Sequence, residues 1–331
     1  MLSRQILSKF FALIVGLGCI YIAYDYNSKS NSLLKGSIYG TTWSINSSDY
    51  ISDYHIANIK NILNSIDQLA SNYKEDSEIA KINKSPLNID LTISNELYEL
   101  ISKAKLITAL SDGTYDITLG KVSASNGFSP NFGEKLSISD NSLNKKYDLN
   151  QTRLIKYQDF WFDMSSIAKG YAVQQLHQYL LSNNLENHLI DIGGEVIVHG
   201  DNKSRAWVVG IQDPSNIQNK PIITISNKNS GFLAIATSGE YRNFRYKDGK
   251  TISHTLDPST NESIDSNLLS ITVVSETSAT LADAYATAIN VMGYERGLDF
   301  VNKNNIAALF IVSEEGELKL IESQKWYDLE L

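Results

Sequence analysis

Asp283 and Thr287 form the pair of side chains whose types and spacing most directly suggest a metal site. They lie four residues apart in an alanine-rich segment, so a helix would place them on one face. A carboxylate and a hydroxyl are hard oxygen donors, and Mg²⁺ takes few protein ligands and completes its octahedron with water and phosphate oxygens. The alternative is a helix packed closely through its alanines, with Asp283 in a first turn favoured by the helix dipole. Both interpretations stay open on this pair alone.

A second candidate site is the start of the helix predicted from Ile167 onward, where the sequence reads SSIAKG. Ser165 and Ser166 are good N-cap residues. The first N–H groups of a helix lack partners within it, and its dipole favours an anion there. Small side chains and Lys169 would let a phosphate approach the backbone, which makes Lys169 a candidate cofactor-binding residue. The alternative is an ordinary capped helix packed on a sheet.

His254 is predicted in a tight turn between strands, shortly before Asp257 and Pro258. Histidine accepts a proton near neutral pH, and a nearby carboxylate can orient it. A structural histidine is the alternative. No role is assigned to the other histidines, which are expected on helix or strand surfaces (His55, His177 and His188) or at a strand end (His199).

These residues require a scaffold of helices and strands. Apolar periodicity predicts helices over residues 52–73, 94–110, from 167 and over 279–292, the last closed by Gly293. Strands are predicted at 36–44 with a break at Gly40, near 117, and at 189–192, 196–198, 206–211, 222–225, 231–239, 269–274 and 307–312. Residues 123–157 are expected to form a surface excursion with a short hairpin. Helices and strands do not alternate regularly, so the predicted fold class is α+β, with mixed sheets and packed helices.

Composition and charge limit the possible functions. The chain has 331 residues, of which 42% are hydrophobic, enough for a sizeable core. Its net charge of −8 argues against a nucleic-acid-binding surface. A single cysteine, Cys19, excludes an intrachain disulfide and a cysteine-based metal site.

The N-terminus is predicted to be a signal peptide or membrane anchor over residues 1–24, followed by a linker over 25–35. Arg4 and Lys9 precede an apolar run over 10–23. Leu-Gly-Cys at 17–19 resembles the end of a bacterial lipoprotein signal, which would lipidate Cys19; an uncleaved inner-membrane anchor is the alternative. Either way, the body over residues 36–331 is expected to be exported, attached to the inner membrane and facing the periplasm.

Ordered motifs from about Gly36 to the chain end resemble the FAD:protein FMN transferase family, the ApbE-type flavin transferases. The motifs are GTTW (40–43), SEIAKIN (77–83), SDGTYDIT (111–118), DMSSIAKGYAV (163–173), IGGEV (192–196), AIATSGEYRN (234–243), SHTLDP (253–258) and ADAYATAINVMG (282–293). This number of motifs in the family's order argues against a chance match, and favours the functional interpretations above.

The resemblance implies an α+β fold that binds FAD in a cleft, with Mg²⁺ on the diphosphate. It makes the Asp283 and Thr287 side chains and the Ala168 carbonyl the metal ligands, and His254 the base that activates the acceptor hydroxyl. It also implies that FAD contacts Tyr39, Tyr73, Thr114, Tyr115, Asp116, Ser165 and Tyr171. Three departures from the family pattern are Tyr39 in place of Met, Asn126 in place of Trp and Glu240 in place of Asp.

The implied reaction transfers FMN from FAD to a threonine or serine hydroxyl of a target protein and releases AMP. Expected targets are acceptor proteins with a flavinylation motif, such as subunits of the sodium-pumping NADH:quinone reductase or the Rnf complex. The alternatives are a Mg²⁺-dependent FAD pyrophosphatase, in which water replaces the hydroxyl, and a non-catalytic flavin-binding lipoprotein. The sequence does not separate the transferase from the pyrophosphatase, since both use the same metal and phosphate site.

Overall fold

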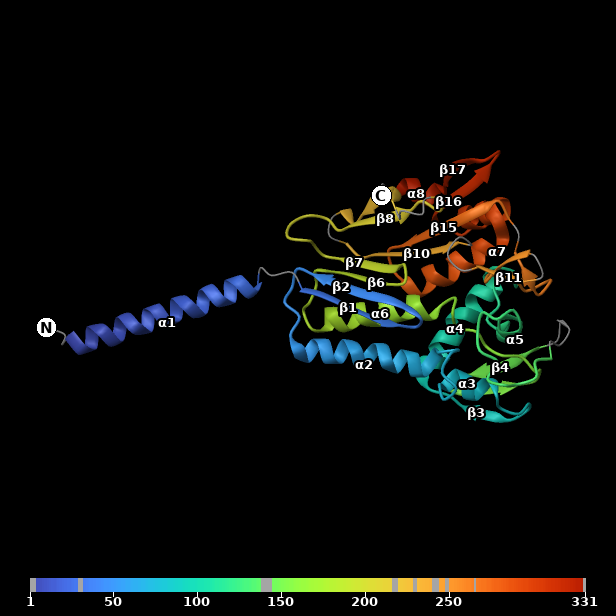
Figure 1. The fold of residues 1–331 in the computed structure, drawn as a ribbon, viewed down its shortest axis with the longest axis horizontal. Coiled ribbons are helices and arrows are strands. Elements are labelled where there is room, and N and C mark those ends of the chain that lie inside the picture. The colour runs from blue at the N-terminus through green and yellow to red at the C-terminus, as the bar shows by residue number, and fades with distance from the viewer. Residues whose placement is uncertain are drawn as a thin grey trace.

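The computed structural model describes residues 4–28, 32–137, 145–215, 220–228, 231–239, 244–247, 250–264 and 266–329. Its largest sheet has eight strands in the order β1-β2-β6-β7-β10-β15-β16-β17, and each neighbouring pair is antiparallel. The strands are β1 (Ser32–Ile38), β2 (Thr41–Ser47), β6 (His188–Ile192), β7 (Glu195–His199), β10 (Leu233–Gly239), β15 (Leu268–Ser275), β16 (Ala307–Glu314) and β17 (Glu317–Glu322). Helices pack against this sheet, which confirms the predicted α+β class (Figure 1).

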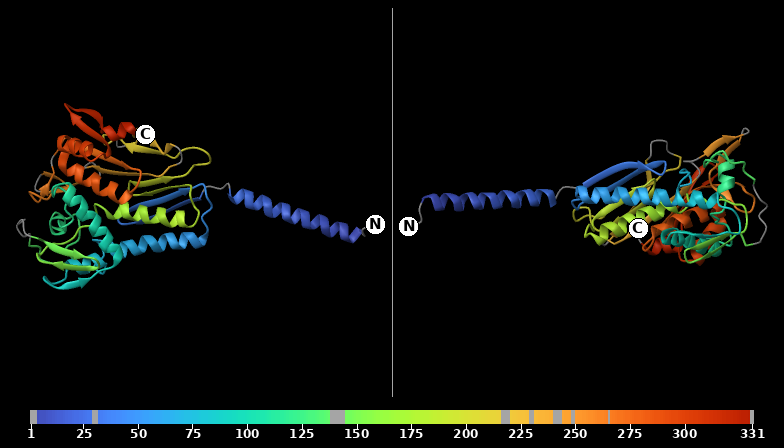
Figure 2. Two further views of the ribbon diagram at one scale, coloured as in Figure 1. Left: turned by 180° about the vertical axis from the view of Figure 1, so that it is seen from behind. Right: turned by 90° about the horizontal axis from the view of Figure 1, so that it is seen from below.

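Both faces of the sheet are covered, because successive residues of its central strands are buried on opposite sides. One face packs against α6 (Ala168–Ser182) and α7 (Ala279–Lys303). Helices α2 (Asp53–Ala70) and α4 (Asn95–Leu110) form a further layer over α6 and α7 (Figures 1 and 2). On the other face, the hairpin of β8 (Val208–Gln212) and β9 (Pro221–Ser226) and the short helix α8 (Gln324–Asp328) contribute Trp207, Ile225 and Trp326 to a second apolar cluster.

Smaller elements surround this core. Strands β3 (Asp90–Thr92), β5 (Arg153–Lys156) and β4 (Tyr147–Asn150) form a three-stranded sheet, which contains the short hairpin predicted within 123–157. Two-stranded sheets are formed by β11 (Phe244–Lys247) with β12 (Lys250–Ser253), and by β13 (Leu256–Asp257) with β14 (Glu262–Ser263). The remaining short helices are α3 (Glu78–Asn83) and α5 (Gly120–Ser125).

The strand predicted at 36–44 with a break at Gly40 forms as a hairpin: the break is confirmed, and the two strands extend beyond the predicted bounds. β1 and β2 are joined by Tyr39 and Gly40, which have φ of 54° and 72°. Positive φ at both central residues is typical of the two-residue turn that matches the twist of paired strands. The predicted linker over 25–35 is correspondingly shorter, since β1 already begins at Ser32.

The strand predicted near Ile117 does not form. Asp116 Oδ1 accepts hydrogen bonds from the backbone N–H and the hydroxyl of Thr118, at 2.8 and 2.7 Å. Such a local bond diverts the backbone donor from a strand ladder. Only an isolated parallel bridge between Leu119 and Trp161 follows in this part of the described chain.

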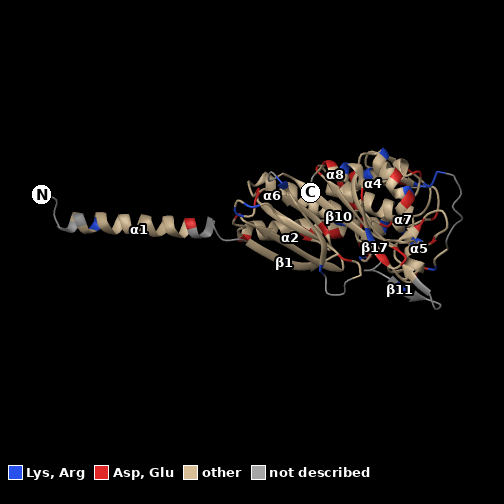
Figure 3. Cartoon of the chain, turned by 90° about the horizontal axis from the view of Figure 1, so that it is seen from above, with Lys and Arg blue, Asp and Glu red and all other residues tan. Residues whose placement is uncertain are grey.

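Helix α1 (Arg4–Ser28) extends away from the body (Figure 1). Its segment Ser8–Asp25 is long and apolar enough to cross a membrane, and none of it is buried. A signal sequence near an N-terminus meets the same criteria, so the helix is compatible with either prediction for residues 1–24. In the body, Lys and Arg are interspersed with Asp and Glu in the view of Figure 3.

His177 and His188 are buried, not on the surface as predicted. His188 Nδ1 lies 2.9 Å from the Leu185 carbonyl, so Nδ1 carries the proton and donates it. Its Nε2 then accepts from His177 Nδ1, also at 2.9 Å. The rings lie in an aromatic cluster with His199 and Phe232, where tertiary packing outweighs the polar character of imidazole.

This histidine pair predicts acid destabilisation. Burial and the neighbouring histidines lower the pKa of His177 from 6.5 to about 3, and burial lowers that of His188 to about 4. As the pH falls from 6.5 towards 4, these two histidines become protonated in the unfolded chain but stay neutral in the folded chain. The free energy of unfolding should therefore fall by about 1.4 kcal/mol per pH unit for each histidine.

Urea titrations of the wild type and the His177→Gln variant, at pH values from about 7 down to about 4, would measure this loss of stability. The difference in free energy of unfolding between the two proteins should shrink as the pH falls, since only the wild type resists protonation at this position. A difference that stays constant over this range would contradict the prediction.

Candidate functional site

Helices α6 and α7 approach each other closely at Gly170. A Cβ on Gly170 would lie 2.5 Å from the Ala279 carbonyl oxygen and 2.6 Å from the Asp283 Cβ, so only glycine fits without displacement. The Gly170 N–H donates to Asp283 Oδ2 at 2.8 Å, and the Ala279 N–H donates to Gln174 Oε1 at 2.9 Å. These contacts hold the Asp283 carboxylate against the beginning of α6.

Substituting Gly170 by alanine is expected to force these two helices apart. Overpacking of this kind costs about 1–3 kcal/mol of stability, and it would also displace the Asp283 carboxylate. The matched control is Gly231→Ala, because a Cβ added at Gly231 would have no neighbour closer than 4.0 Å. Thermal unfolding should show a lower midpoint for Gly170→Ala alone; equal midpoints for the two variants would contradict the close contact.

The start of α6 differs from the prediction. Ile167 is the N-cap residue, with φ −148°, and no side chain caps the helix. The Ser166 hydroxyl donates instead to the Tyr115 hydroxyl at 2.9 Å, and the Ser165 N–H donates to Asp163 Oδ1 at 3.0 Å. The Ser166 hydroxyl is thus directed to a tertiary contact with Tyr115.

Lys169, Glu195 and Asp283 form a charged cluster at this junction. Lys169 Nζ lies 2.5 Å from Glu195 Oε1. Burial raises the pKa of Glu195 to about 7, with the Asp283 charge adding to the effect and Lys169 opposing it. Burial likewise raises the pKa of Asp283, against the charge of Lys169 and the hydrogen bond from Gly170. Two buried carboxylates thus share one ammonium group, and a further cation would stabilise their charged forms.

The residues present fit a magnesium ion. Asp283 and Thr287 lie four residues apart on α7, and the contact at Gly170 brings the neighbouring Ala168 backbone close to Asp283. These donors are hard oxygens, as Mg²⁺ prefers. The described residues contain no group of three or more His, Cys, Asp and Glu suited to a metal. A site of one carboxylate, one hydroxyl and one main-chain carbonyl is of a different kind, in which water and phosphate complete the coordination.

The predicted residues at 114–116 lie near this junction. Tyr115 is buried, and the charges of Asp283, Asp163 and Asp116 all act on its hydroxyl, whose pKa is raised chiefly by burial. Asp116 Oδ2 pairs with Lys146 Nζ at 2.7 Å. The Thr114 hydroxyl accepts a hydrogen bond from Arg296 of α7 at 3.3 Å. Segment 114–116 thus contacts the segment just before α6 through Tyr115 and α7 through Thr114.

A second group gathers Tyr73 and His254 around Phe128. The Tyr73 hydroxyl donates to the Phe128 carbonyl. The Phe128 ring meets His254 edge-on, with centroids 6.3 Å apart, and the Arg245 guanidinium lies 5.7 Å from the same ring. Partial burial raises the pKa of Tyr73, and the charge of Asp163 also raises it while Arg245 lowers it.

This second group is connected to the metal candidates through α7. The Asn290 side chain donates to the Thr255 hydroxyl at 3.2 Å, which places the residue after His254 against the helix that carries Asp283 and Thr287. Asp163 acts electrostatically on both Tyr73 and Tyr115, one from each group. The structure therefore brings most of the predicted site residues to one region beside α6 and α7.

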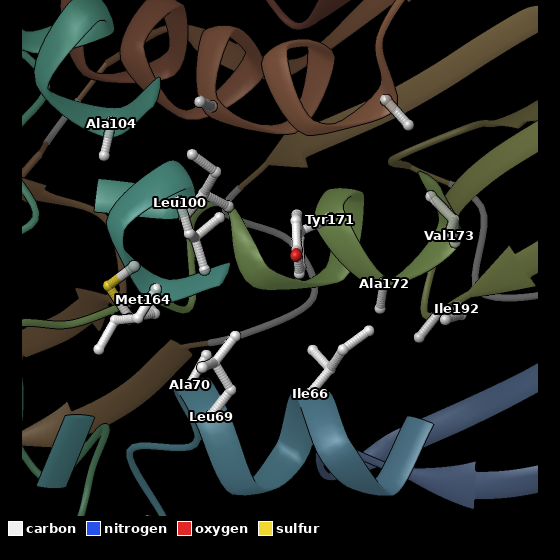
Figure 4. Packing of buried hydrophobic residues seen from close by; sticks show 14 of the residues in the cluster. Ile66, Leu69, Ala70, Leu100, Ala104, Met164, Tyr171, Ala172, Val173 and Ile192 are labelled. Carbon is white, nitrogen blue, oxygen red and sulfur yellow. The ribbon is translucent and has the colours of Figure 1, made fainter. Parts of the chain in front are cut away.

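Tyr171, the residue after Gly170 on α6, and Tyr39 both contribute to the packing of the main core. Tyr171 is buried in the main core cluster, and burial together with Glu99 and Glu96 raises its pKa to about 12. Figure 4 shows its ring among Leu100, Met164 and Ile66. The Tyr39 hydroxyl donates to the Leu63 carbonyl of α2 at 2.8 Å. Their contacts with FAD remain predictions, and these packing contacts do not require a ligand.

Sequence reasoning missed the role of Glu195 in this cluster. From the sequence, Glu195 was noted only as part of the IGGEV motif. The available signal was the position of this carboxylate at the start of an apolar strand. Such a strand is buried, and buried carboxylates are rare unless they are paired. Glu240 and the adjoining residues 241–243 of the AIATSGEYRN motif lie outside the described residues.

Comparison with solved structures first defines the class of protein. The fold matches the flavin transferase ApbE from Vibrio cholerae with a TM-score of 0.78 and 28% identity, covering 90% of this chain and 99% of that one. It matches the ApbE protein from Thermotoga maritima with a TM-score of 0.78 and 29% identity, covering 91% and 100%. A flavin-transferase fold therefore carries the cluster at the α6–α7 junction.

Sequence comparisons then identify the family. The sequence model of the ApbE family matches residues 39–310. The FAD:protein FMN transferase of Vibrio cholerae is 31% identical over 303 residues, which are 86% of this chain and 89% of that protein. The enzyme of the same name from Escherichia coli is 29% identical over 304 residues, 86% and 85% of the two chains. The chain belongs to the ApbE family.

Proposed function

We propose that this protein transfers FMN from FAD to a threonine or serine hydroxyl of a target protein, with Mg²⁺ at the site and AMP as the other product. Family membership and the names of its relatives support the transferase activity and FAD as the substrate. The observation that carries the site assignment is the contact at Gly170, which places the Asp283 carboxylate against the first turn of α6.

The Asp283 carboxylate, the Thr287 hydroxyl and the Ala168 carbonyl would hold the metal. Bound there, Mg²⁺ would neutralise charge on the diphosphate of FAD. Lys169, at the beginning of α6, adds a positive charge beside the same position. The hydrogen bond between the Ser166 and Tyr115 hydroxyls links the segment before α6 to the loop that carries Thr114 and Asp116.

His254 is the proposed base. It accepts the proton of the acceptor hydroxyl as the hydroxyl oxygen bonds to the FMN phosphorus. The bond between that phosphorus and the bridging oxygen of the diphosphate breaks, and AMP leaves with the bridging oxygen. Little covalent chemistry falls to the protein in such a transfer, so positioning and charge stabilisation dominate. The edge-on contact with Phe128 helps to fix the His254 ring.

Product analysis separates this function from its alternatives. The purified protein would be incubated with FAD and Mg²⁺, with and without a flavin-acceptor domain, and free FMN and AMP would be measured by chromatography. AMP release that depends on the acceptor, with no matching free FMN, is expected. Equal release of FMN and AMP without an acceptor would indicate the pyrophosphatase, and FAD binding without products would indicate a binding protein.

Localisation and partners follow from the same proposal. Helix α1 would attach the body to the inner membrane on its periplasmic side, either uncleaved or, after cleavage, through a lipid on Cys19. The acceptors would then be exported flavin-carrying subunits of membrane redox complexes, of the sodium-pumping NADH:quinone reductase or Rnf type. Globomycin, which blocks lipoprotein signal cleavage, would change the electrophoretic mobility of the protein only if Cys19 is lipidated.

A further inference from the structure

Glu195 is a buried charged residue that the proposed mechanism leaves without a role. It begins β7 directly after the Gly193–Gly194 turn, and its residue is 3% exposed. The turn is fixed, since the Gly194 N–H donates to Asp191 Oδ1 at 2.9 Å and the Gly193 N–H donates to the Thr42 carbonyl at 3.0 Å. The backbone therefore fixes the origin of the Glu195 side chain beneath the beginning of α6.

The two oxygens of this carboxylate are used differently. Oε1 accepts from Lys169 Nζ at 2.5 Å. Oε2 is buried and has no hydrogen-bond partner among the described residues. Leaving a buried charged acceptor unsatisfied costs stability, and such a group in a native protein calls for an explanation beyond packing. A purely structural ion pair would gain more from a site that satisfied both oxygens.

The charges around Glu195 suggest that explanation. Glu195 and Asp283 interact electrostatically, and Lys169 acts on both. When all three groups are charged, two carboxylates face one ammonium group, so the cluster carries a net charge of −1 (two negative charges and one positive). A further cation at this position would stabilise the charged form of the cluster.

We infer that Glu195 is a positioning residue: it holds the Lys169 ammonium at the start of α6, beside the diphosphate, and its second oxygen adds negative charge to the magnesium position. The inference rests on the proposed function for the identity of the ligands. Groups that orient or support metal ligands in this way typically change metal affinity about 10–100-fold when they are removed.

The test measures FAD binding by flavin fluorescence, in EDTA and in Mg²⁺, alongside ligand-free thermal unfolding. Glu195→Gln keeps the shape of the side chain and removes its charge. In the wild type, Mg²⁺ should raise the affinity for FAD by a certain factor. In Glu195→Gln this factor should be smaller by about tenfold or more. Lys169→Met should weaken FAD binding in EDTA as well, and in EDTA the double variant should bind FAD no more weakly than Lys169→Met alone.

The control is Asp159→Asn, which removes the carboxylate paired with Lys121 at 2.5 Å outside this cluster. It should leave the Mg²⁺ effect unchanged. The ligand-free melting temperature of Glu195→Gln should stay equal to or above that of the wild type, since a half-satisfied buried charge is removed. A lower melting temperature with an unchanged Mg²⁺ effect would show a structural ion pair and overturn the inference.

Failure of the proposed function would give a different result. A wild type that binds FAD more tightly with Mg²⁺ but transfers no FMN would contradict the transferase activity, while the binding comparison would still decide the role of Glu195. A wild type whose FAD affinity does not respond to Mg²⁺ would overturn the inference directly, because Glu195 would then support no cation.

Discussion

Replacing Asp283 by alanine is expected to lower the rate of FMN transfer by at least about 1,000-fold, since a bound metal contributes several kcal/mol of charge stabilisation in the transition state. Asp283 supplies the only carboxylate among the three proposed metal ligands, and its Oδ2 also accepts the Gly170 N–H. Transfer rates at saturating FAD, measured over a range of Mg²⁺ concentrations, would give the effect.

Two further variants separate loss of metal from loss of structure. Asp283→Asn keeps an oxygen that can accept from Gly170, so the α6–α7 contact should persist while transfer is still lost. Thr287→Val removes only a neutral donor from a half-buried position on the same face of α7. The transfer rate of Thr287→Val should fall less than that of Asp283→Asn, and it should recover at high Mg²⁺ concentration. Full activity of Asp283→Asn without added metal would exclude the proposed ligand set.

Replacing His254 by glutamine is expected to slow transfer by about 10²–10⁴-fold, the usual contribution of a positioned general base. FAD and Mg²⁺ should bind nearly as they do to the wild type, because His254 lies in the group around Phe128 and not among the proposed metal ligands. Single-turnover transfer to an acceptor domain would measure the chemical step apart from binding.

The matched control is His55→Gln. His55 Nδ1 lies 2.8 Å from the Tyr179 hydroxyl, so it is another hydrogen-bonded histidine of the body, on α2. Its replacement should leave the transfer rate unchanged. If His254→Gln retained the wild-type rate of the chemical step, His254 could not be the base, and the hydroxyl would have to be activated by another group.

Much of the fold could be predicted from local patterns in the sequence. Helix α4 was predicted because Leu97, Leu100, Ile101, Ala104 and Ile107 repeat at helical spacing, and all five are buried. Strands β15 and β16 were predicted from apolar runs, which are continuous because the sheet is covered on both faces. The break at Gly293 within α7 was also predicted, and φ there is 72°.

The errors arose where distant residues decide the local structure. Ile167 and not a serine is the N-cap residue of α6, and the Ser166 hydroxyl donates to Tyr115, which is far away in sequence. His177 and His188 are buried because they hydrogen-bond to each other. The order of the strands was not predicted at all, since the pairing of β2 with β6 joins segments separated by five helices and a small sheet.

In the candidate site, too, local features could be predicted and contacts between distant segments could not. The spacing of Asp283 and Thr287 was sufficient to place them on one face of a helix, as the structure does. The opposing wall was not predictable, because it depends on the close approach at Gly170 and on the contact of Lys169 with Glu195 across the α6–β7 interface. Periodicity identifies which residues share an element, whereas the juxtaposition of elements depends on the complete fold.

The most direct test of the central proposal is the intact mass of an acceptor protein. A flavin-acceptor domain with the flavinylation motif would be incubated with this protein, FAD and Mg²⁺, and then weighed by mass spectrometry. The acceptor should gain the mass of one covalently bound FMN, and the gain should disappear with EDTA or when the acceptor threonine is replaced by alanine. An acceptor of unchanged mass, despite bound FAD and Mg²⁺, would contradict the assignment of this protein as an FMN transferase.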